Sequence, residues 1–228
     1  MRDQDRLLWN NQQKQLRASL SHLNNYPETL SLFLHQHAMV HAASLTPDEP
    51  IHFQESLIST LTDAQWRTIL PNGEHSLAWI FWHMARIEDM TMNLLIAGTQ
   101  QVFLKEEWPL RLKISVLDSG NSMSVDEIKT ITDSMDITEL MNYRNAVALR
   151  TREIVQTLDP AQLKKRVDSG RLQQMLSVGA VRPAAIGLIE YWGGLKYAGL
   201  LLMPPTRHNF VHLNEARLLK EKLAKQKA

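Results

Sequence analysis

The sequence predicts an all-α fold, a four-helix bundle with crossover connections and accessory helices. The first observation behind this prediction is a 3.6-residue period of apolar residues along several long segments. The second is the lack of any alternating apolar and polar stretch long enough for a strand. The third is the length of the connections between the periodic segments, which suits loops that cross the ends of a bundle.

The first part of the chain is expected to hold an N-terminal helical arm, residues 1–27, followed by the bundle domain, residues 28–222. Residues 28–45 are predicted to be a helix with histidines on its inner face, stopped by Thr46 and Pro47. Steps of three or four residues place one stripe of side chains on that face. The stripe consists of Leu30, Leu34, Ala38, His41 and Leu45.

The middle of the chain is expected to contain the most buried helix. A weaker helix over residues 53–66 precedes it, and a turn at residues 71–73 separates the two. Residues 76–97 carry apolar side chains nearly all the way round, which is typical of a helix buried in a bundle, and Gly98 is a fitting stop. Residues 99–123 contain turn signals and are expected to be a long connection rather than a regular element.

Further helices are expected in the last part of the chain. Ser124 and Glu127 have the spacing of a capping box and start a short helix. Pro204 and Pro205 are expected to break or kink the chain between the last two helices. The Lys-rich end, residues 223–228, is expected to be a flexible basic tail. The longer helices are predicted over residues 138–158, 182–203 and 205–222.

The composition excludes several classes of protein. The chain has no cysteine, so any metal must be held by nitrogen and oxygen ligands. Its 25 basic and 24 acidic residues are spread along the sequence, which gives no basic face for nucleic acid. The apolar run at residues 184–203 carries Glu190 and Lys196, which favours a buried helix over a membrane span. With no signal-peptide pattern, the protein is expected to be cytoplasmic.

Two histidines on the last predicted helix have the spacing of metal ligands. His208 and His212 lie four residues apart, so both imidazoles face the same side of the helix. Glu215 follows three residues later and could be a third ligand or could orient one imidazole. A pair at this spacing is only half of a site, and such pairs are also common without metal, bonded to water and carbonyl groups.

A further histidine lies in an apolar setting. His83 occurs within WIFWHMARIED, so its ring nitrogens need partners inside the protein, and taken alone it fits a core histidine bonded to a neighbouring helix. Glu88 follows within two turns, where an internal ion pair is the plain explanation. His37 and His41 could join the site, cap the opposite end of its cavity or simply pack. The histidines expected at the surface or in caps are His22, His35, His52 and His75.

The stretch EHSLAWIFWHMARIEDMTMNLLIAG and the later RHNFVHLNEA together resemble the DinB-like superfamily, which includes the YfiT-type metal-dependent hydrolases. The first stretch is similar to the family's second bundle helix, which supplies one ligand histidine, and His83 is the matching residue. Two further ligands come as HxxxH on the family's fourth helix, where this sequence has His208 and His212. The resemblance covers roughly residues 28–222.

The resemblance implies a four-helix bundle that holds a divalent metal on three histidines, with zinc or nickel foremost and iron as an alternative. It also implies a homodimer and a small-molecule substrate, such as a low-molecular-weight thiol, because relatives include thiol S-transferases. The gap between His83 and His208 is longer than is usual in the family. If residues 190–199 are the counterpart of the ligand helix instead, Trp192 and Lys196 take the ligand positions and the metal site is lost.

Two functions therefore stay open. In the first, His83, His208 and His212 hold a metal that activates water or a thiol for hydrolysis or S-transfer. Glu215 or Glu88 would then carry a proton or orient a ligand. In the second, the bundle has lost the metal and acts as a small-molecule-binding or stress-associated interaction protein. Aromatic residues near the candidate site indicate a largely apolar pocket, although such residues more often pack in a core: Trp79, Trp82, Tyr191, Trp192 and Phe210.

Overall fold

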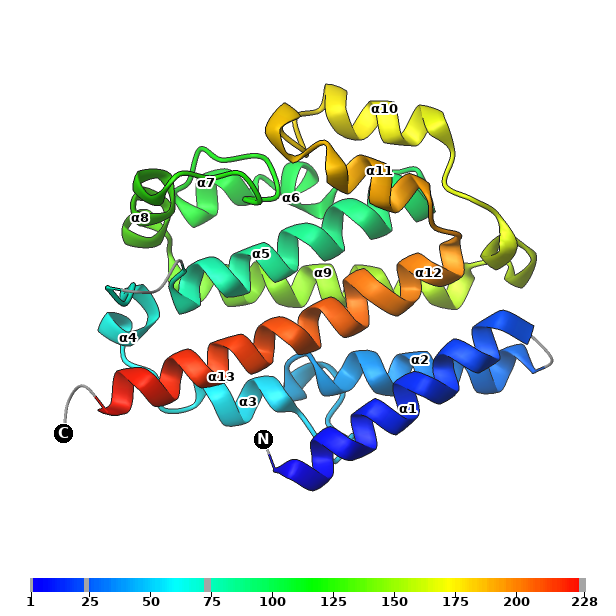
Figure 1. Cartoon of the computed structure of the whole chain (residues 1–228), viewed down its shortest axis with the longest axis horizontal. Coiled ribbons are helices and arrows are strands. Elements are labelled where there is room, and N and C mark those ends of the chain that lie inside the picture. Colours follow the sequence, from blue (N-terminus) through cyan, green and yellow to red (C-terminus); the bar gives the residue numbers. More distant parts are fainter. Residues whose placement is uncertain (1, 23–24, 72–74, 226–228) are drawn as a thin grey trace.

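The computed structural model describes residues 2–22, 25–71 and 75–225, and these residues are helical with connecting loops (Figure 1). No strand occurs in these ranges, where the only pairing of the β type is an isolated bridge between Arg166 and Lys196. The all-α prediction is therefore confirmed. No helix in the same ranges combines the length and the apolarity needed to cross a membrane.

Four long helical segments form the bundle. α5 contacts both α9 and α13, and α2 contacts α9, so the four enclose a common core. Figure 1 shows α5 and α9 running side by side, with the continuous segment from α12 to α13 running diagonally past them and α2 below. The bounds are α2 (Tyr26–Met39), α5 (Leu77–Met90) with its π-helical extension η2 (Thr91–Ala97), α9 (Ile137–Thr157), and α12 (Tyr197–Leu202) joined through the π-helical segment η5 (Met203–His208) to α13 (Asn209–Lys225).

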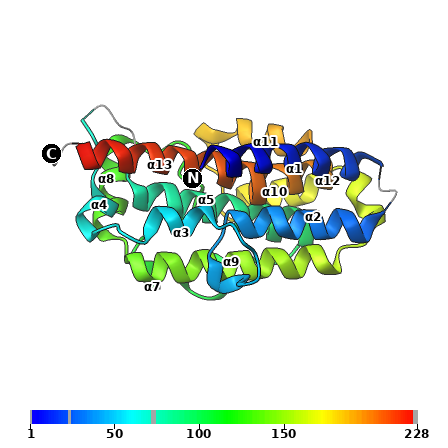
Figure 2. The same cartoon turned by 90° about the horizontal axis from the view of Figure 1, so that it is seen from below.

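Shorter helices surround this bundle. α1 (Asp3–His22) packs on α2 and α12 at one edge, as both views show (Figure 2). α10 and α11 pack together on the side away from α1 and α2. The remaining elements are η1 (Ala43–Leu45), α3 (Phe53–Ile58), α4 (Asp63–Arg67), α6 (Val102–Lys105), α7 (Trp108–Leu112), α8 (Val125–Ser134), η3 (Pro160–Lys164), α10 (Ser169–Ser177), η4 (Pro183–Ala185) and α11 (Gly187–Gly193).

Several predicted boundaries are confirmed. α5 with η2 and α9 match the predicted helices at 76–97 and 138–158 to within one residue. Gly98 has the left-handed φ of 68° that stops η2, as expected for glycine at this position. Ser124 and Glu127 form the predicted capping box at the start of α8. The predicted turn at 71–73 lies largely outside the described residues, as does the end of the tail, residues 226–228.

The helix predicted over 28–45 is shorter than expected. α2 begins at Tyr26 and ends at Met39, and only a 3-10 turn follows at residues 43–45. The reason is a pair of tertiary hydrogen bonds that replace the helical ones. Arg144 donates to the Val40 carbonyl (2.8 Å), and the Ala43 amide donates to the carboxylate of Glu55 (3.1 Å).

The single helix predicted over 182–203 is wrong, because the chain breaks between α11 and α12. The break follows the pair Gly193 and Gly194, where the backbone turns to meet a distant segment. The Val167 amide donates to the Leu195 carbonyl (3.4 Å), and the Tyr197 amide donates to the Lys165 carbonyl (3.0 Å). Gly194 still has a right-handed helical backbone, whereas Lys196 is extended (φ -87°, ψ 165°), and these two hydrogen bonds stabilise the extended backbone on either side of it.

Two other corrections concern proline and the long connection. Pro204 and Pro205 do not break the helix, because the wider turn of η5 accommodates them and carries α12 directly into α13. The connection at 99–123 is not wholly irregular, since it contains α6 and α7. The carboxylate of Asp89 accepts hydrogen bonds from the first two amides of α6 (2.9 and 2.8 Å), a contact between separate elements that local turn signals do not show.

Candidate metal centre

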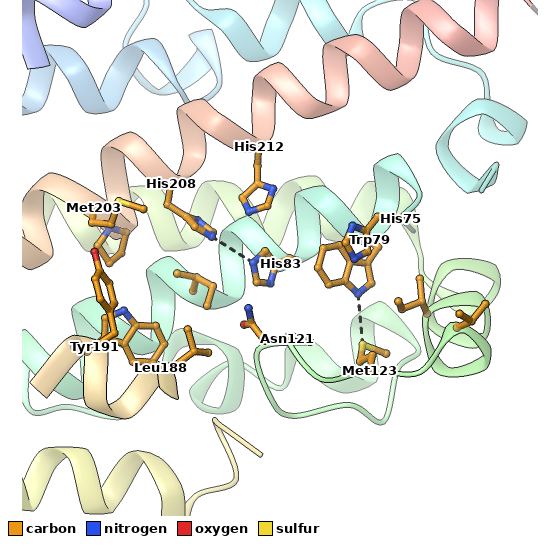
Figure 3. A pocket seen from close by; sticks show the side chains of 16 residues that line it. His75, Trp79, His83, Asn121, Met123, Leu188, Tyr191, Met203, His208 and His212 are labelled. Atoms are coloured by element: carbon orange, nitrogen blue, oxygen red, sulfur yellow. Dashed lines mark hydrogen bonds between the residues drawn. The ribbon is translucent and has the colours of Figure 1, made fainter. Parts of the chain in front are cut away.

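Three histidines from two bundle segments converge at the wall of one pocket (Figure 3). His83 comes from the middle of α5, His208 from the end of η5 and His212 from the first turn of α13. The ring centres lie 4.5–5.1 Å apart, and each side chain offers a ligand atom within 4.8 Å of the others. The structure thus brings together the three histidines that the resemblance implied.

The orientation of His83 is set by a loop that precedes α8. Nδ1 of His83 donates to the Ser119 carbonyl (2.6 Å), which leaves Nε2 facing His208 at 3.3 Å. Gly120 brings the loop close to α5 with a positive φ of 82°, and a Cβ there would lie 2.6 Å from the Trp82 ring. Arg182 anchors the loop through the carboxylate of Asp118 (2.6 Å).

Glu215 orients His212, the histidine on α13. Nδ1 of His212 donates to its carboxylate (2.7 Å), and Nδ1 of His75 lies 3.4 Å from the other carboxylate oxygen. Burial opposes ionisation of Glu215, but the hydrogen bonds from His212 and His75 lower its pKa to about 2. Glu215 therefore lies beside the three-histidine group as an ionised acceptor, which is one of the two positions the sequence left open for it.

His75 was expected to be a surface or capping group, and the structure places it at the pocket instead. Its ring stacks on Trp79 (3.7 Å between ring centres), which in turn stacks on His83 (4.7 Å). The steps of four residues from His75 to Trp79 to His83 are a signal that could have been read, since they continue one stripe past the helix start at Ser76. The contact with Glu215 joins residues 140 apart and has no local signal.

Burial keeps the imidazoles of His83 and His208 neutral. Loss of hydration lowers the pKa of His83 to about 3, and the proximity of His212 reinforces the shift. Burial also lowers the pKa of His208 well below its ordinary value, with further lowering from His83 and His212. Only neutral imidazole is a metal ligand, so His83 and His208 are in the ligand form at neutral pH.

The geometry fits a divalent ion. Two nitrogen ligands 2.0–2.1 Å from a tetrahedral zinc ion lie about 3.3–3.4 Å apart, and Nε2 of His83 and Nε2 of His208 are 3.3 Å apart. The Nδ1 atoms of His83 and His212 donate to a carbonyl and a carboxylate, the arrangement that orients ligand histidines in metal sites. His208 lacks such an acceptor, because its Nδ1 atom is buried with no hydrogen-bond partner in the described ranges.

The pocket beside the three histidines is large enough for a small molecule. Its volume is about 630 Å³, and its walls come from α5, α8, α11 and η5. Trp192 lies in the α11 wall, while Lys196 caps α12 and is not part of the lining. The alternative counterpart of the ligand helix, with Trp192 and Lys196 in the ligand positions, is therefore less consistent with the geometry than the pair His208 and His212.

A second histidine group is buried in the bundle core. His37 and His41 approach the two carboxylate oxygens of Glu88 through their Nε2 atoms (2.9 and 3.1 Å), and Asn209 donates to the same carboxylate (2.6 Å). Burial opposes ionisation of Glu88, but the two histidines hold its pKa well below the usual range. The carboxylate of Glu88, expected to carry a proton or orient a ligand at the metal, is thus engaged with other partners and makes none of the described hydrogen bonds to the pocket histidines.

This core group also has the residue types of a metal site, and its three possible ligand atoms lie within 4.8 Å of one another. Its chemistry differs from that of the pocket group, because the carboxylate already accepts from three nitrogen donors and no described pocket reaches it. Arg144, buried nearby, donates to Gln54 (2.7 Å) and brings a positive charge close to Glu88. The core group therefore fits a buried polar network better than a metal site.

The comparison with known protein families matches the part of the chain that carries His83. The family model described as DinB superfamily matches residues 54–181, more than half of the chain. The match contains α5 and His83 but ends before η5 and α13, which carry His208 and His212. No curated protein matches the chain.

Proposed function

Since the chain belongs to the DinB superfamily, we propose that it binds one divalent metal ion on His83, His208 and His212 and acts on a small molecule in the adjoining pocket. The observation that carries the proposal is the convergence of three imidazoles, two of which are oriented by acceptors outside the group. His83 and His212 each donate through Nδ1, so their Nε2 atoms are free to act as ligands.

Bound there, a divalent ion would lower the pKa of a water or thiol ligand and so supply a nucleophile near neutral pH. The surrounding residues favour hydrolysis or S-transfer on a small molecule. Glu215 holds a proton on Nδ1 of His212 and keeps that imidazole in one orientation. The apolar pocket walls exclude water from the reacting groups. Imidazole ligands suit zinc or nickel, and iron as an alternative.

The test is the metal content of protein purified without a His tag. We expect about one equivalent of zinc, nickel or iron per chain in the wild type and a loss of most of it in His83→Ala. His22→Ala is the matched control, because His22 is exposed at the end of α1, far along the chain from the pocket. Metal content that is the same in the wild type and in His83→Ala would rule the proposal out.

The second candidate function is a bundle that binds small molecules without a metal. The end of the family match before His208 favours it, because two of the three proposed ligands lie outside the matched region. Metal-free protein that still binds small molecules in its pocket would support this alternative.

The homodimer and the cytoplasmic location expected from the sequence are predictions too. Light scattering coupled to size-exclusion chromatography measures the oligomeric state.

A further inference from the structure

We infer that the pocket beside the three histidines takes an uncharged small molecule with an aromatic or branched aliphatic body, and that it disfavours molecules whose body carries a carboxylate. The inference names the ligand class of the proposed site and rests on the proposed function for the donor group that faces the histidines. The preference for an uncharged body depends on the walls alone, so it holds with or without the metal.

The walls away from the histidines are apolar on three sides. The loop and first turns of α8 contribute Met123 and Ile128, α11 contributes Leu188 and Trp192, and η5 contributes Pro204. A ligand body that fills this space replaces water with carbon and sulfur surfaces, which stabilises the bound state in proportion to the apolar area removed from water. The cavity of about 630 Å³ lies within the usual range for drug-sized ligands.

Most polar groups of the lining lie along one side. His75, His83, His208 and His212 form that side, Asn121 points toward His83, and the Tyr191 hydroxyl on α11 is the exception (Figure 3). A ligand would place its one polar donor here and its body against α8 and α11. The arrangement of one histidine-lined side and largely apolar walls therefore orients the ligand as well as selecting it.

Positive charge is missing from the described lining, which contains no lysine or arginine. Arg182 follows α10 on the chain near this side of the bundle, but Asp118 and Glu127 already neutralise it (2.6 and 2.8 Å). A carboxylate on the ligand body would lose its hydration against the walls without gaining a cation in return, and such a transfer is unfavourable.

The aromatic surface open to a ligand lies on α11. Trp79 is covered on one face by His75 and on the other by His83, so it offers a ligand no free face. Leu188 and Tyr191 occupy the opposite wall, where Tyr191 is 47% exposed and Leu188 is half-buried. Leu188 is therefore the position at which an added cation would reach the ligand body while its charged head keeps contact with water.

The test uses two probes that differ by one charge, benzyl mercaptan and 4-(mercaptomethyl)benzoate, with binding followed by tryptophan fluorescence. We expect the wild type to bind the uncharged probe at least about tenfold more tightly, since burying an uncompensated carboxylate is costly. Leu188→Arg should bring the two affinities to within about threefold of each other by pairing with the carboxylate. Leu149→Arg, an exposed position on α9, is the matched control and should keep the wild-type preference.

Each measurement is made on metal-loaded protein and again with a chelator. Protein that binds no metal but keeps the preference would contradict the proposed function and support the inference. Protein that binds metal but binds the two probes equally well would support the proposed function and contradict the inference. The inference is also overturned if neither probe binds, or if Leu188→Arg leaves the preference unchanged while the variant folds as the wild type does by circular dichroism.

Discussion

The two histidine groups of this bundle share a sequence pattern and differ in what surrounds it. Each contains a pair of histidines four residues apart together with one residue of α5, His83 in the pocket group and Glu88 in the core group. In the core group the histidine Nε2 atoms face a carboxylate inside the group. In the pocket group two Nδ1 atoms bond to acceptors outside the group, which leaves the Nε2 atoms to face the other histidines, and Nε2 of His83 lies 3.3 Å from Nε2 of His208. The hydrogen-bond partners, and not the spacing, separate a buried polar network from a candidate metal-ligand set.

The position of each group in the fold explains this difference. Glu88 and Asn209 point into the space between α2, α5, α9 and α13, where no exposed surface remains. His83 and His208 lie on the other side of the same two segments and face the pocket. The Glu88 carboxylate in the core finds its partners within the protein, whereas the polar atoms at the pocket can accept a ligand.

The largest effect that would sharpen this comparison is the removal of the core carboxylate. Glu88→Ala should lower the free energy of unfolding by about 3–5 kcal/mol, because it leaves His37, His41 and Asn209 buried without their acceptor. Chemical denaturation measures the change. Glu190→Ala, at an exposed position on α11, is the control and should stay within about 0.5 kcal/mol of the wild type. A small loss in Glu88→Ala would contradict the structural role of the core group.

Helical rotation could have separated the two groups from sequence alone. Successive residues of a helix are rotated by about 100°, so Glu88, five residues after His83, faces a direction about 140° away. Glu88 lies within two turns of His83 along the chain, which places it beside the metal only if this rotation is left out of account. The rotation predicts that Glu88 and His83 serve different clusters, as the structure shows.

Some features of the fold follow from local sequence patterns, and others depend on contacts between distant residues. The buried helix at α5, its stop at Gly98 and the capping box of α8 follow from periodicity and local hydrogen bonding, and these were predicted. The break after Gly193 depends on hydrogen bonds to residues 165–167, which are close only in the folded chain. The role of His75 depends in the same way on Glu215. The sequence did not predict these two features because they depend on contacts between distant residues, and not because the local helix propensity is weak.

The next effect in size comes from removal of the metal. A metal that binds only the folded chain stabilises it by about 2.7 kcal/mol at a hundredfold excess over its dissociation constant. For a chain of this length, a chelator should then lower the melting temperature by about 5–11 °C. His212→Ala should show no response to the chelator, whereas His37→Gln, in the core group, should respond as the wild type does. A wild-type melting temperature indifferent to chelator and to added zinc or nickel would contradict metal binding.

Loss of the acceptor that orients His212 should have a smaller effect, confined to the pocket group. Glu215→Ala should weaken metal binding by about tenfold to a hundredfold, the usual effect of removing a group that orients a ligand histidine. Glu215→Gln should recover part of this loss, because its amide oxygen can still accept from Nδ1 of His212. Calorimetric titration with zinc measures the affinities, and Glu221→Ala, exposed on the same helix, should bind as the wild type does. Equal affinity in all four proteins would remove Glu215 from the site.

The smallest expected effect is a pH dependence that belongs to the core group. Burial lowers the pKa of His41 to about 3, against the charge of Glu88, which raises it. The folded chain therefore keeps His41 neutral at pH 5.5, while the unfolded chain, with a pKa of about 6.5, binds a proton there. Because the unfolded state binds more protons, this histidine contributes stability above pH 6.5 that is lost as the pH falls toward 3.

The loss at pH 5.5 is about 1.4 kcal/mol for one such histidine, from the difference between the two pKa values. Between pH 7.5 and pH 5.5, with chelator present, the wild type should therefore lose about 1.4 kcal/mol more than His41→Gln, which keeps an N–H donor for Glu88 but does not titrate. His22→Gln, exposed on α1, should lose as much as the wild type. Urea denaturation at the two pH values measures each loss, and equal losses in the wild type and His41→Gln would show that His41 is protonated in the folded core.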